Sequence, residues 1–240
     1  MKIGIAGYAG RVGQLLLNEL QSGNWTGLEL SGGTSRKGHE NISGLLTTTN
    51  AEELFKTSDA LIDFTLPEGT MNHAALAAKH GKILIIGTTG LSDQQEAELA
   101  EHAKSATIVY AANMSLGVNL LAALIEQAAR ALGPDEWDIE IFESHHKHKI
   151  DAPSGTALAL GKAAAKGRST TLPSSIDPDR NGKREAGEIG FSVARGGDVV
   201  GEHTVFFYGE GERIELTHRA TNRALFARGA LKAALWAKDK

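Results

Sequence analysis

Residues 2–13 read KIGIAGYAGRVG, an apolar run that passes directly into glycines spaced three apart. The run predicts a buried strand over Lys2–Ala6, and apolar residues at helical spacing then predict a helix from Arg11 to Leu20. Glycines between a strand and a helix allow a tight turn, and the helix N-terminus offers free N–H groups to a phosphate. The segment therefore predicts a βαβ fold with a dinucleotide-binding turn.

The glycine spacing differs from the usual G-x-G-x-x-G fingerprint. Gly10 and Gly13 fit its last two positions, whereas Tyr8 occupies the first. A tight strand–helix turn without a ligand is the alternative interpretation. The position of the turn, at the start of an alternating strand and helix pattern, favours dinucleotide binding.

Strands and helices continue to alternate through the first half of the chain. Further strands are expected at Leu28–Leu30, Ala60–Thr65, Lys82–Gly87 and Thr107–Ala111, with helices over Pro67–His80 and after a capping box at Ser92. This alternation predicts an α/β fold with a doubly wound parallel sheet.

The pattern changes near Asn113–Gly117, where we expect the main domain boundary. Beyond it the expected elements are a helix over Val118–Leu132, a strand over Asp138–Ser144, a helix over Ser154–Lys166, strands over Ile189–Arg195, Val199–Tyr208 and Glu212–Arg219, and a last helix over Arg223–Lys238. The three closely spaced strands predict a meander in an open sheet. The polar stretch 167–185 is expected to be an exposed loop.

Composition limits the classes of function. The 240 residues suffice for two domains, and 25 basic against 29 acidic residues give a net charge of −4, which argues against a nucleic-acid partner. There is no cysteine, so disulfides and thiolate metal sites are excluded. Apolar runs such as Ile83–Ile86 are too short to span a membrane, and the first residues lack a signal peptide. We therefore expect a cytoplasmic protein without a membrane partner.

The segment after the second expected strand indicates which nicotinamide cofactor is used. Residues 32–37 read GGTSRK, and no carboxylate for the ribose hydroxyls of NAD occurs before Glu40. The hydroxyls of Thr34 and Ser35 and the cations of Arg36 and Lys37 suit a 2′-phosphate, although a solvated basic loop is the alternative. The pattern favours NADPH without excluding NADH.

Two later strand ends carry small and hydroxyl residues. Phe64 and Thr65 follow one strand, and residues 87–90, GTTG, follow the next. In a doubly wound sheet, ligands lie outside the carboxyl ends of the strands, so these residues can line a nicotinamide ribose. Each segment alone is also compatible with a simple turn.

The densest chemistry lies in residues 143–156, ESHHKHKIDAPSGT. If the segment stays extended, His145, Lys147 and Lys149 share one face, and His146 and His148 share the other. Histidine can donate or accept a proton near neutral pH, and lysine can neutralise an anion or donate a proton.

Residues 153–156, PSGT, follow at an expected helix start. The backbone N–H groups and hydroxyls of Ser154, Gly155 and Thr156 would form a carboxylate cradle beside these cations, which predicts a small acidic substrate. A solvated basic strand end is one alternative. A metal site is another, but we predict none, because adjacent histidines of a strand point to opposite faces and the lysines would repel a cation.

These residues resemble the 4-hydroxy-tetrahydrodipicolinate reductase (dihydrodipicolinate reductase) family of the diaminopimelate route to lysine. The resemblance is carried by residues 143–157, ESHHKHKIDAPSGTA, and by IDFT at 62–65, PEGT at 67–70, GTTG at 87–90, AAN at 111–113 and VVGEHT at 199–204. It covers nearly the whole chain.

The resemblance implies a Rossmann-like domain over residues 1–114, completed by a C-terminal helix over 221–240. It also implies an α+β substrate-binding and tetramerisation domain with an open mixed sheet over 115–220, and hence a homotetramer. The implied activity transfers a hydride from NAD(P)H to C4 of a cyclic imino dicarboxylate, with loss of water from C4 of the hydroxylated substrate and a proton to C3.

The resemblance also implies site residues. His145 matches a catalytic proton donor or acceptor and Lys149 a catalytic proton donor, and the residues leave open which of them delivers the proton. The expected substrate-binding residues are His146, Ser154, Gly155, Thr156 and Arg223. The expected cofactor-binding residues are Gly7, Tyr8, Gly10, Arg11, Val12, Ser35, Arg36, Phe64, Thr65, Gly87, Thr88, Thr89, Ala111, Ala112, Asn113 and Met114.

The chain departs from the family pattern at two points. Met114 stands where the family commonly has phenylalanine, and the acidic residue that some members carry after the second strand is missing. Two other functions remain as alternatives. One is a different two-domain NAD(P)-dependent dehydrogenase, and the other is a non-catalytic NADPH-binding relative.

Overall fold

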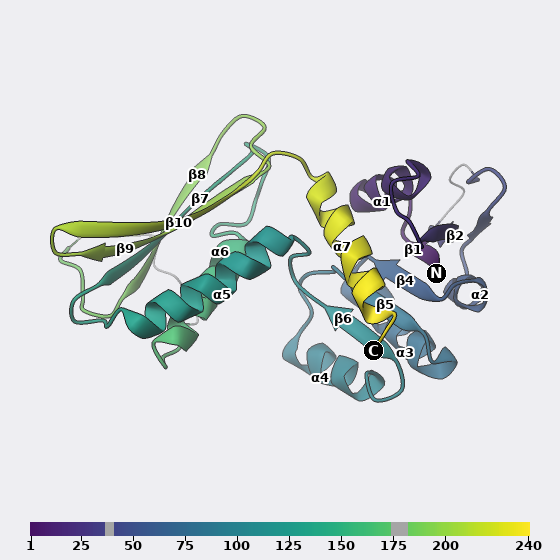
Figure 1. The fold of residues 1–240 in the computed structure, drawn as a ribbon, viewed down its shortest axis with the longest axis horizontal. Helices are drawn as coiled ribbons and strands as arrows, with labels where there is room; N and C mark the ends of the chain where they lie inside the picture. The colour runs from purple at the N-terminus through teal and green to yellow at the C-terminus, as the bar shows by residue number, and fades with distance from the viewer. Residues whose placement is uncertain (37–40, 174–181) are drawn as a thin grey trace. The chain divides into compact units, whose positions relative to one another are not determined.

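The computed structural model describes residues 1–36, 41–173 and 182–240 and divides into two compact units. The first unit holds Met1–Ser115 and Arg223–Lys240, and the second holds Leu116–Asn222 (Figure 1). Part of the expected loop over 167–185 lies outside the described residues. Among the helices that are described, none is long and apolar enough to cross a membrane.

The first unit is a parallel sheet of six strands with helices on both faces. Its elements are β1 (Lys2–Ala6), α1 (Arg11–Gln21), β2 (Glu29–Thr34), β3 (Leu46–Thr48), α2 (Ala51–Thr57), β4 (Ala60–Asp63), α3 (Pro67–His80), β5 (Ile83–Ile86), α4 (Asp93–His102), β6 (Thr107–Tyr110) and α7 (Ala224–Ala237). The strand order is β3-β2-β1-β4-β5-β6, so the winding reverses beside β1. The expectation of a doubly wound, Rossmann-like sheet is confirmed.

Two apolar clusters hold the helices to opposite faces of this sheet. Ile3 and Ile5 of β1 pack with Leu16 of α1 and Leu231 of α7 in one cluster. In the other cluster, residues of β4 and β5 pack with α2, α3 and α4. Because strands buried on both faces need helices on both sides, the apolar runs of these strands predict the layering.

Local signals set the helix ends in this unit. Pro67 begins α3, where its missing N–H costs nothing, and Gly81 ends the helix with φ of 60°. Ser92 and Gln95 form the expected capping box at the start of α4.

Three features of the first unit differ from the expectations. β2 extends to Thr34 and is longer than the expected Leu28–Leu30, while β3 and α2 were not expected at all. Gly32 and Gly33 weaken the strand signal of β2, but pairing with β1 on one side and β3 on the other keeps them extended. α2 is too short for a helical period, although its cap Asn50 accepts a hydrogen bond from the N–H of Glu52.

The second unit is a mixed sheet of four strands packed against two helices. Its elements are α5 (Leu116–Ala131), β7 (Asp138–His145), α6 (Gly155–Gly167), β8 (Ile189–Arg195), β9 (Gly201–Gly209) and β10 (Glu212–Ala220). Ile139 and Ile141 share the buried face of β7, as expected, and pack with Ile125 of α5 and Leu160 of α6. The expected open mixed sheet is confirmed.

The expected meander of the last three strands is wrong. The sheet order is β10-β9-β7-β8, so β7 lies between β8 and β9, and only β9 and β10 form a hairpin. β8 is parallel to β7 because α6 connects them as a βαβ crossover. The crossover places Phe191 of β8 against Gly161 of α6.

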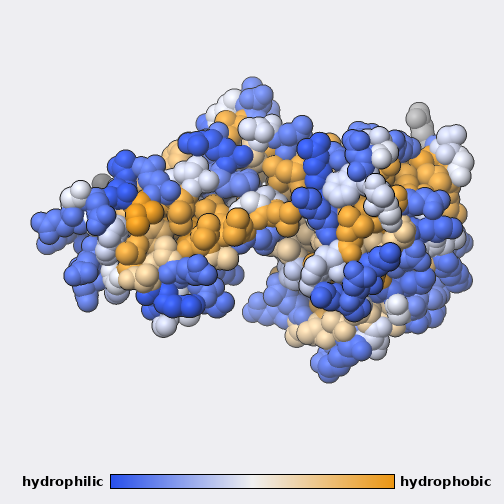
Figure 2. Space-filling view, in the orientation of Figure 1, coloured by the Kyte–Doolittle hydropathy of each residue, from blue (hydrophilic) through white to orange (hydrophobic). Residues whose placement is uncertain are grey.

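An apolar band crosses the second unit in Figure 2 and follows α5. Leu116, Leu120 and Leu124 are 54%, 62% and 42% exposed, and their spacing of four residues puts them on one side of the helix. The buried residues of α5 lie on its other side, which is the side that packs on the sheet.

We predict that Gly229→Ala destabilises the first unit. A Cβ at Gly229 of α7 would collide with the carbonyl oxygen of Met114, so the helix would have to shift. Glycine to alanine within a helix usually gains up to about 1 kcal/mol, whereas overpacking costs about 1–3 kcal/mol. Urea unfolding of both proteins measures the difference. The exposed Lys232→Ala on the same helix is the control, and an equal or greater stability of Gly229→Ala would contradict the packing described.

Candidate active site

The turn after β1 provides a backbone cradle for an anion. Gly7 has φ of 70°, and a Cβ at Gly13 would lie 2.7 Å from the Cα of Tyr8. α1 begins after Gly10 with no side-chain cap and no acidic residue in its first turn. The N–H groups at this helix end are therefore not taken up by a capping side chain, and they fit the pyrophosphate of a dinucleotide.

The other expected cofactor-binding residues follow the carboxyl ends of neighbouring strands. In the sheet, Ala6 pairs with Thr34 and Asp63, Asp63 with Ile86, and Ile86 with Tyr110. The residues that follow these strand ends lie along one edge of the sheet: Gly7, Tyr8, Gly10, Arg11 and Val12; Ser35 and Arg36; Phe64 and Thr65; Gly87, Thr88 and Thr89; Ala111, Ala112, Asn113 and Met114. The reversal of the winding beside β1 makes this edge the expected ligand site.

Some of these side chains build the edge instead of lining it. The Tyr8 ring is 3% exposed and packs on Gly33, and Met114 is 5% exposed within the core. The main chain of Tyr8 is also engaged, since its N–H donates to the carbonyl of Thr34 and its carbonyl accepts from the Gln14 amide. A Cβ at Gly87 would collide with the Phe64 ring, so the expected residues Phe64 and Gly87 are in contact.

The ribose end of the site follows β2. Thr34 ends the strand, and its Oγ1 accepts a hydrogen bond from the N–H of Gly7 at 3.4 Å. Ser35 and Arg36 come next, with the Ser35 N–H donating to the carbonyl of Thr48. Lys37 and Glu40, which also entered the prediction of NADPH, lie outside the described residues.

A buried carboxylate fixes the loops after β4 and β5. Asp63 is fully buried and accepts hydrogen bonds from the N–H and the hydroxyl of Thr65 at 2.8 and 2.6 Å, and its other oxygen lies 2.8 Å from Nδ1 of His73. The Thr65 N–H also donates to Oγ1 of Thr88, which accepts from Thr70. Burial would raise the pKa of Asp63, but the bonds from His73 and the threonines hold it below its ordinary value.

A second buried carboxylate organises the end of β7. Glu143 is 1% exposed, and one of its oxygens lies 2.5 Å from Nδ1 of His145. Arg195 at the end of β8 donates to both oxygens at 2.7 and 2.8 Å, and the Ser154 N–H donates at 2.9 Å. Burial would raise the pKa of Glu143, but the bonds from His145, Arg195 and Ser154 lower it to about 2.

His203 of β9 lies on the other side of His145. The two rings meet edge to face with centroids 5.1 Å apart, and Nε2 of His203 lies 3.0 Å from the Ser154 hydroxyl. Burial first, and then the charges of His145, His218 and Lys149 against that of Glu143, lower the pKa of His203 to about 4. His203 is therefore neutral at neutral pH and does not act as a cation in the site.

The segment does not stay extended beyond His145, so the alternation of faces that an extended chain would give does not apply there. β7 ends at His145, and the chain then turns, with the Lys149 N–H donating to the carbonyl of His146 at 3.1 Å. Nζ of Lys149 lies 2.8 Å from both oxygens of Asp151. Lys147 and Lys149 therefore do not continue the face of His145. The carbonyl of Gly197, which accepts from the Lys147 N–H, helps to hold the turn.

The start of α6 corrects the expectation for Ser154. Its hydroxyl accepts a hydrogen bond from the Ala157 N–H at 3.1 Å and bonds His203, and its own N–H donates to Glu143. Ser154 is 2% exposed, so it builds the site and does not present its hydroxyl to a ligand. Gly155 is exposed and Thr156 half-buried in the first turn, and the helix end can still receive an anion there.

The last expected substrate residue, Arg223, lies in the first unit. It is the N-terminal cap of α7, and its carbonyl accepts from the N–H of Phe226.

Three residues of the side-chain cluster around His145 are not among the site residues expected from the sequence: Glu143, Arg195 and His203. Glu143 stands two residues before His145, so the alternation of a strand could have placed both side chains on one face. Arg195 and His203 are 52 and 60 positions from Glu143 (195 − 143 and 203 − 143), and only the pairing of β7 with β8 and β9 brings them there.

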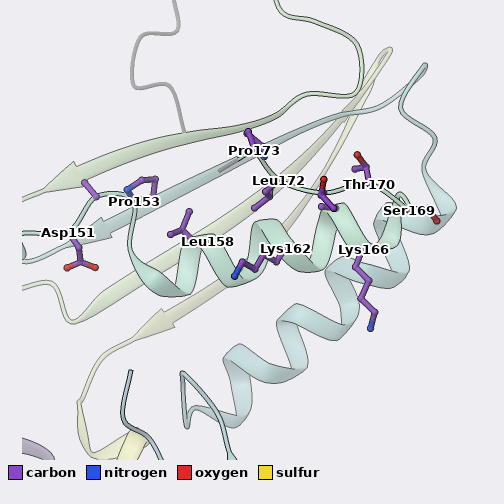
Figure 3. Close-up of a pocket in the computed structure, with 12 residues that line it drawn as sticks. Asp151, Pro153, Leu158, Lys162, Lys166, Ser169, Thr170, Leu172 and Pro173 are labelled. Atoms are coloured by element: carbon purple, nitrogen blue, oxygen red, sulfur yellow. The ribbon is translucent and has the colours of Figure 1, made fainter. Parts of the chain in front are cut away.

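A pocket of about 1030 Å³ lies along α6 (Figure 3). Its lining includes Asp151, Pro153, Leu158 and Lys162, and continues through Ser169 to Pro173. None of the expected catalytic or substrate-binding residues is among the described residues that line it. No group of three or more His, Cys, Asp or Glu suited to a metal ion occurs among the residues described.

Comparisons with known proteins match the whole chain. Family models described as the N-terminus and C-terminus of dihydrodipicolinate reductase match residues 1–114 and 117–240. The chain is 49% identical to the 4-hydroxy-tetrahydrodipicolinate reductase of Parvibaculum lavamentivorans, and 47% identical to that of Rhizobium rhizogenes. Both alignments cover 100% of this chain, with 93% and 92% of the respective relatives.

Solved structures give the same relationship. A dipicolinate-bound dihydrodipicolinate reductase from Paenisporosarcina sp. TG-14 is similar with a TM-score of 0.82 and 25% identity, over 100% of this chain and 95% of that one. An aspartate dehydrogenase from Thermotoga maritima has a TM-score of 0.55 at 12% identity, over 100% of this chain and 97% of that one, and it shares the fold alone.

We predict that His203 makes the protein less stable as the pH falls from about 6.5 to 4. The pKa of His203 is lowered from 6.5 to about 4, so the unfolded chain takes up a proton in this range while the folded chain does not. His203→Gln keeps a side chain that can bond Ser154 but cannot titrate. The slope of the unfolding free energy against pH gives the number of protons taken up on unfolding. In the variant this number should be smaller by up to one proton between pH 4 and 6.5.

Urea unfolding at a series of pH values measures that slope. The exposed His148→Gln serves as the control and should leave it unchanged. Equal slopes for wild type and His203→Gln would show that His203 titrates normally in the folded protein.

Proposed function

The chain belongs to the dihydrodipicolinate reductase family, and we propose that it reduces 4-hydroxy-tetrahydrodipicolinate to tetrahydrodipicolinate with a nicotinamide cofactor, in the diaminopimelate pathway of lysine biosynthesis. The observation that carries the proposal is the site at the end of β7. There, His145 is held by a buried carboxylate beside the N-terminus of α6. A proton donor next to an anion site suits a small carboxylate substrate, and the solved relative in its dipicolinate complex binds such a dicarboxylate.

The first unit is proposed to hold the cofactor. The N–H groups of the first turn of α1, which begins after Gly10, would bind the pyrophosphate, and the loops that Asp63 fixes would lie along the nicotinamide half. The nicotinamide supplies the hydride when it is bound. In the overall reaction, substrate, NAD(P)H and one proton give tetrahydrodipicolinate, NAD(P)⁺ and water.

The second unit is proposed to hold the substrate and deliver the proton. The N–H groups of Gly155 and Thr156 would bind one carboxylate, and Lys149 and His146 would neutralise the dianion. Loss of water from C4 of the hydroxylated substrate would first leave a carbon–carbon double bond conjugated with the ring imine. As hydride reaches C4, the electron pair of that double bond moves toward the ring imine. Nε2 of His145, after taking up a proton from solvent while Nδ1 keeps its own hydrogen, would then place that proton on the carbon beside C4.

NADPH is proposed as the preferred cofactor. Ser35 and Arg36 follow β2 at the position where NAD-specific chains carry an acidic residue. A guanidinium there would attract a 2′-phosphate, while the missing carboxylate removes the usual partner of the NAD ribose. A cytoplasmic location belongs to the same proposal, because reduced nicotinamide cofactors are available there.

A homotetramer is proposed through the open face of the second sheet. α5 and α6 cover one face, while Phe142 and Tyr208 on the other face are 38% and 37% exposed. Phe206 stacks on Tyr208, with the guanidinium of Arg213 above both rings. Aromatic and arginine side chains of this kind are enriched in protein interfaces.

The first experiment follows nicotinamide oxidation in a coupled assay. Substrate is generated from pyruvate and aspartate semialdehyde by its synthase, and NADPH and NADH are compared side by side. We expect oxidation that depends on the synthase product and is faster with NADPH. Folded, cofactor-binding protein that oxidises neither cofactor would favour the non-catalytic relative instead.

In the same assay, we expect His145→Gln to lower kcat by about 10²–10⁴-fold, because a positioned acid or base contributes about that factor. Cofactor affinity, measured by fluorescence titration, should stay within a factor of about two, since His145 lies in the other unit. His148→Gln, in the same turn but exposed, is the matched control and should retain activity. An equal loss of turnover and cofactor affinity would contradict this role for His145.

We expect Tyr208→Glu to weaken the tetramer, because a carboxylate cannot be buried between apolar faces without a partner. Light scattering should show a tetramer for wild type and smaller species for the variant. Glu212→Gln, at the exposed start of β10, is the control and should not change the mass. A monomeric wild type at micromolar concentration would contradict the interface.

A further inference from the structure

We propose that Glu143, clamped by Arg195, is a positioning residue that keeps the proton of neutral His145 on Nδ1, so that Nε2 is the nitrogen that serves the substrate. The inference rests on the proposed reductase activity for its kinetic consequence. Its structural part concerns the histidine alone and can be measured without any substrate.

The hydrogen bonds around Glu143 leave it no role except that of acceptor. One oxygen accepts from the Ser154 N–H and Arg195, and the other accepts from Arg195 and faces Nδ1 of His145 at 2.5 Å. An ionised carboxylate carries no hydrogen to donate. Nδ1 of His145 must therefore carry the hydrogen in this contact.

Arg195 keeps the carboxylate charged and in place. Its guanidinium is bidentate on Glu143 and also donates to the carbonyls of Ala194 and Asp151, so it is tied to the end of β8 and to the loop between β7 and α6. A buried carboxylate with two such bonds stays ionised. Arg195 and the Ser154 N–H thus hold the carboxylate in the position from which it orients the His145 ring.

The structure also keeps space free around Nε2 of His145. Gly201 of β9 lies beside this nitrogen, and a Cβ there would be 2.9 Å from it. Within the described residues, Nδ1 of His145 bonds Glu143 and Nε2 of His145 makes no hydrogen bond. Proton exchange by His145 therefore falls to the nitrogen that Glu143 does not hold.

The neighbouring titratable groups do not replace Glu143 in this role. His203 meets the ring edge to face and is bonded to Ser154, and behind it in the sheet lies His218. Lys149 is paired with Asp151. His146 follows His145 in the chain, and its Nδ1 accepts from the His148 N–H. Among the described residues, only Glu143 bonds Nδ1 of His145 directly, and Arg195 acts on it through Glu143.

Glu143→Gln tests the proposal, because every partner of the carboxylate is a donor. A glutamine must turn its NH₂ toward one of them, and only His145 can respond by changing tautomer, whereas the Ser154 N–H and the Arg195 guanidinium cannot. We therefore expect the hydrogen of neutral His145 to move to Nε2. We also expect kcat to fall by about 10²–10⁴-fold, the factor that a positioned acid contributes, because a glutamine carries no charge to stabilise the His145 ring when Nε2 holds the proton that it delivers.

The readout that separates positioning from mere stability is ¹⁵N NMR of histidine-labelled protein, which distinguishes the two tautomers. Wild type should show Nδ1–H and Glu143→Gln should show Nε2–H, with cofactor affinity unchanged. Glu140→Gln is the matched control, because it removes a Glu–Arg pair with Arg184 on the opposite face of the same strand. It should alter neither the tautomer nor kcat.

The wild-type spectrum keeps the proposal testable if Glu143→Gln does not fold. A wild-type His145 with its hydrogen on Nε2 overturns the proposal, as does a folded Glu143→Gln with an unchanged tautomer or full kcat. Wild-type protein with the expected tautomer but no reductase activity would overturn the proposed function and leave the tautomer assignment standing.

Discussion

The buried carboxylate of Glu143 is the interaction on which the second unit's site depends. It joins the end of β7 to the end of β8 through Arg195 and to the start of α6 through the Ser154 N–H. His145 takes its orientation from the same carboxylate. Removing one partner of a buried ion pair leaves an uncompensated charge, so these elements are coupled more strongly than apolar packing alone would couple them. His145, the proposed proton donor, is thus held by the sheet and not by a loop.

The first unit uses the same device. Asp63 ends β4, is fully buried, and accepts from Thr65 and His73, while Thr88 connects the next strand end to this network. In both units a carboxylate at a strand end binds the polypeptide itself and not a ligand. The ligand positions are left to backbone N–H groups at the starts of α1 and α6, where no acidic side chain occupies the first turn. Anionic ligands can therefore bind without competing with a carboxylate.

How far the sequence predicts the structure depends on the range of the interaction. Elements set by local chemistry were foreseen, such as α3 between Pro67 and Gly81. The sheet order of the second unit was not foreseen, because the parallel pairing of β7 with β8 depends on how α6, which connects them, packs against the sheet.

The site residues follow the same rule. His145 and Lys149 stand out as residue types in one segment, whereas Arg195 becomes visible only through that pairing. The start of α2 carries a local signal, because Asn50 followed three residues later by Glu53 has the spacing of a capping box.

The turn after His145 separates the roles of the two residues that the sequence could not distinguish. His145 is buried on a strand, and its Nδ1 bonds the carboxylate of Glu143. Arg195 in turn makes two hydrogen bonds to that carboxylate. Lys149 lies on the turn, and its partner Asp151 is 61% exposed, so that pair is screened by water and contributes little energy. A lysine held this weakly can leave Asp151 for a substrate carboxylate, while a histidine held this firmly can place a proton at one position. This difference supports the proposal that Lys149 compensates charge and His145 delivers the proton.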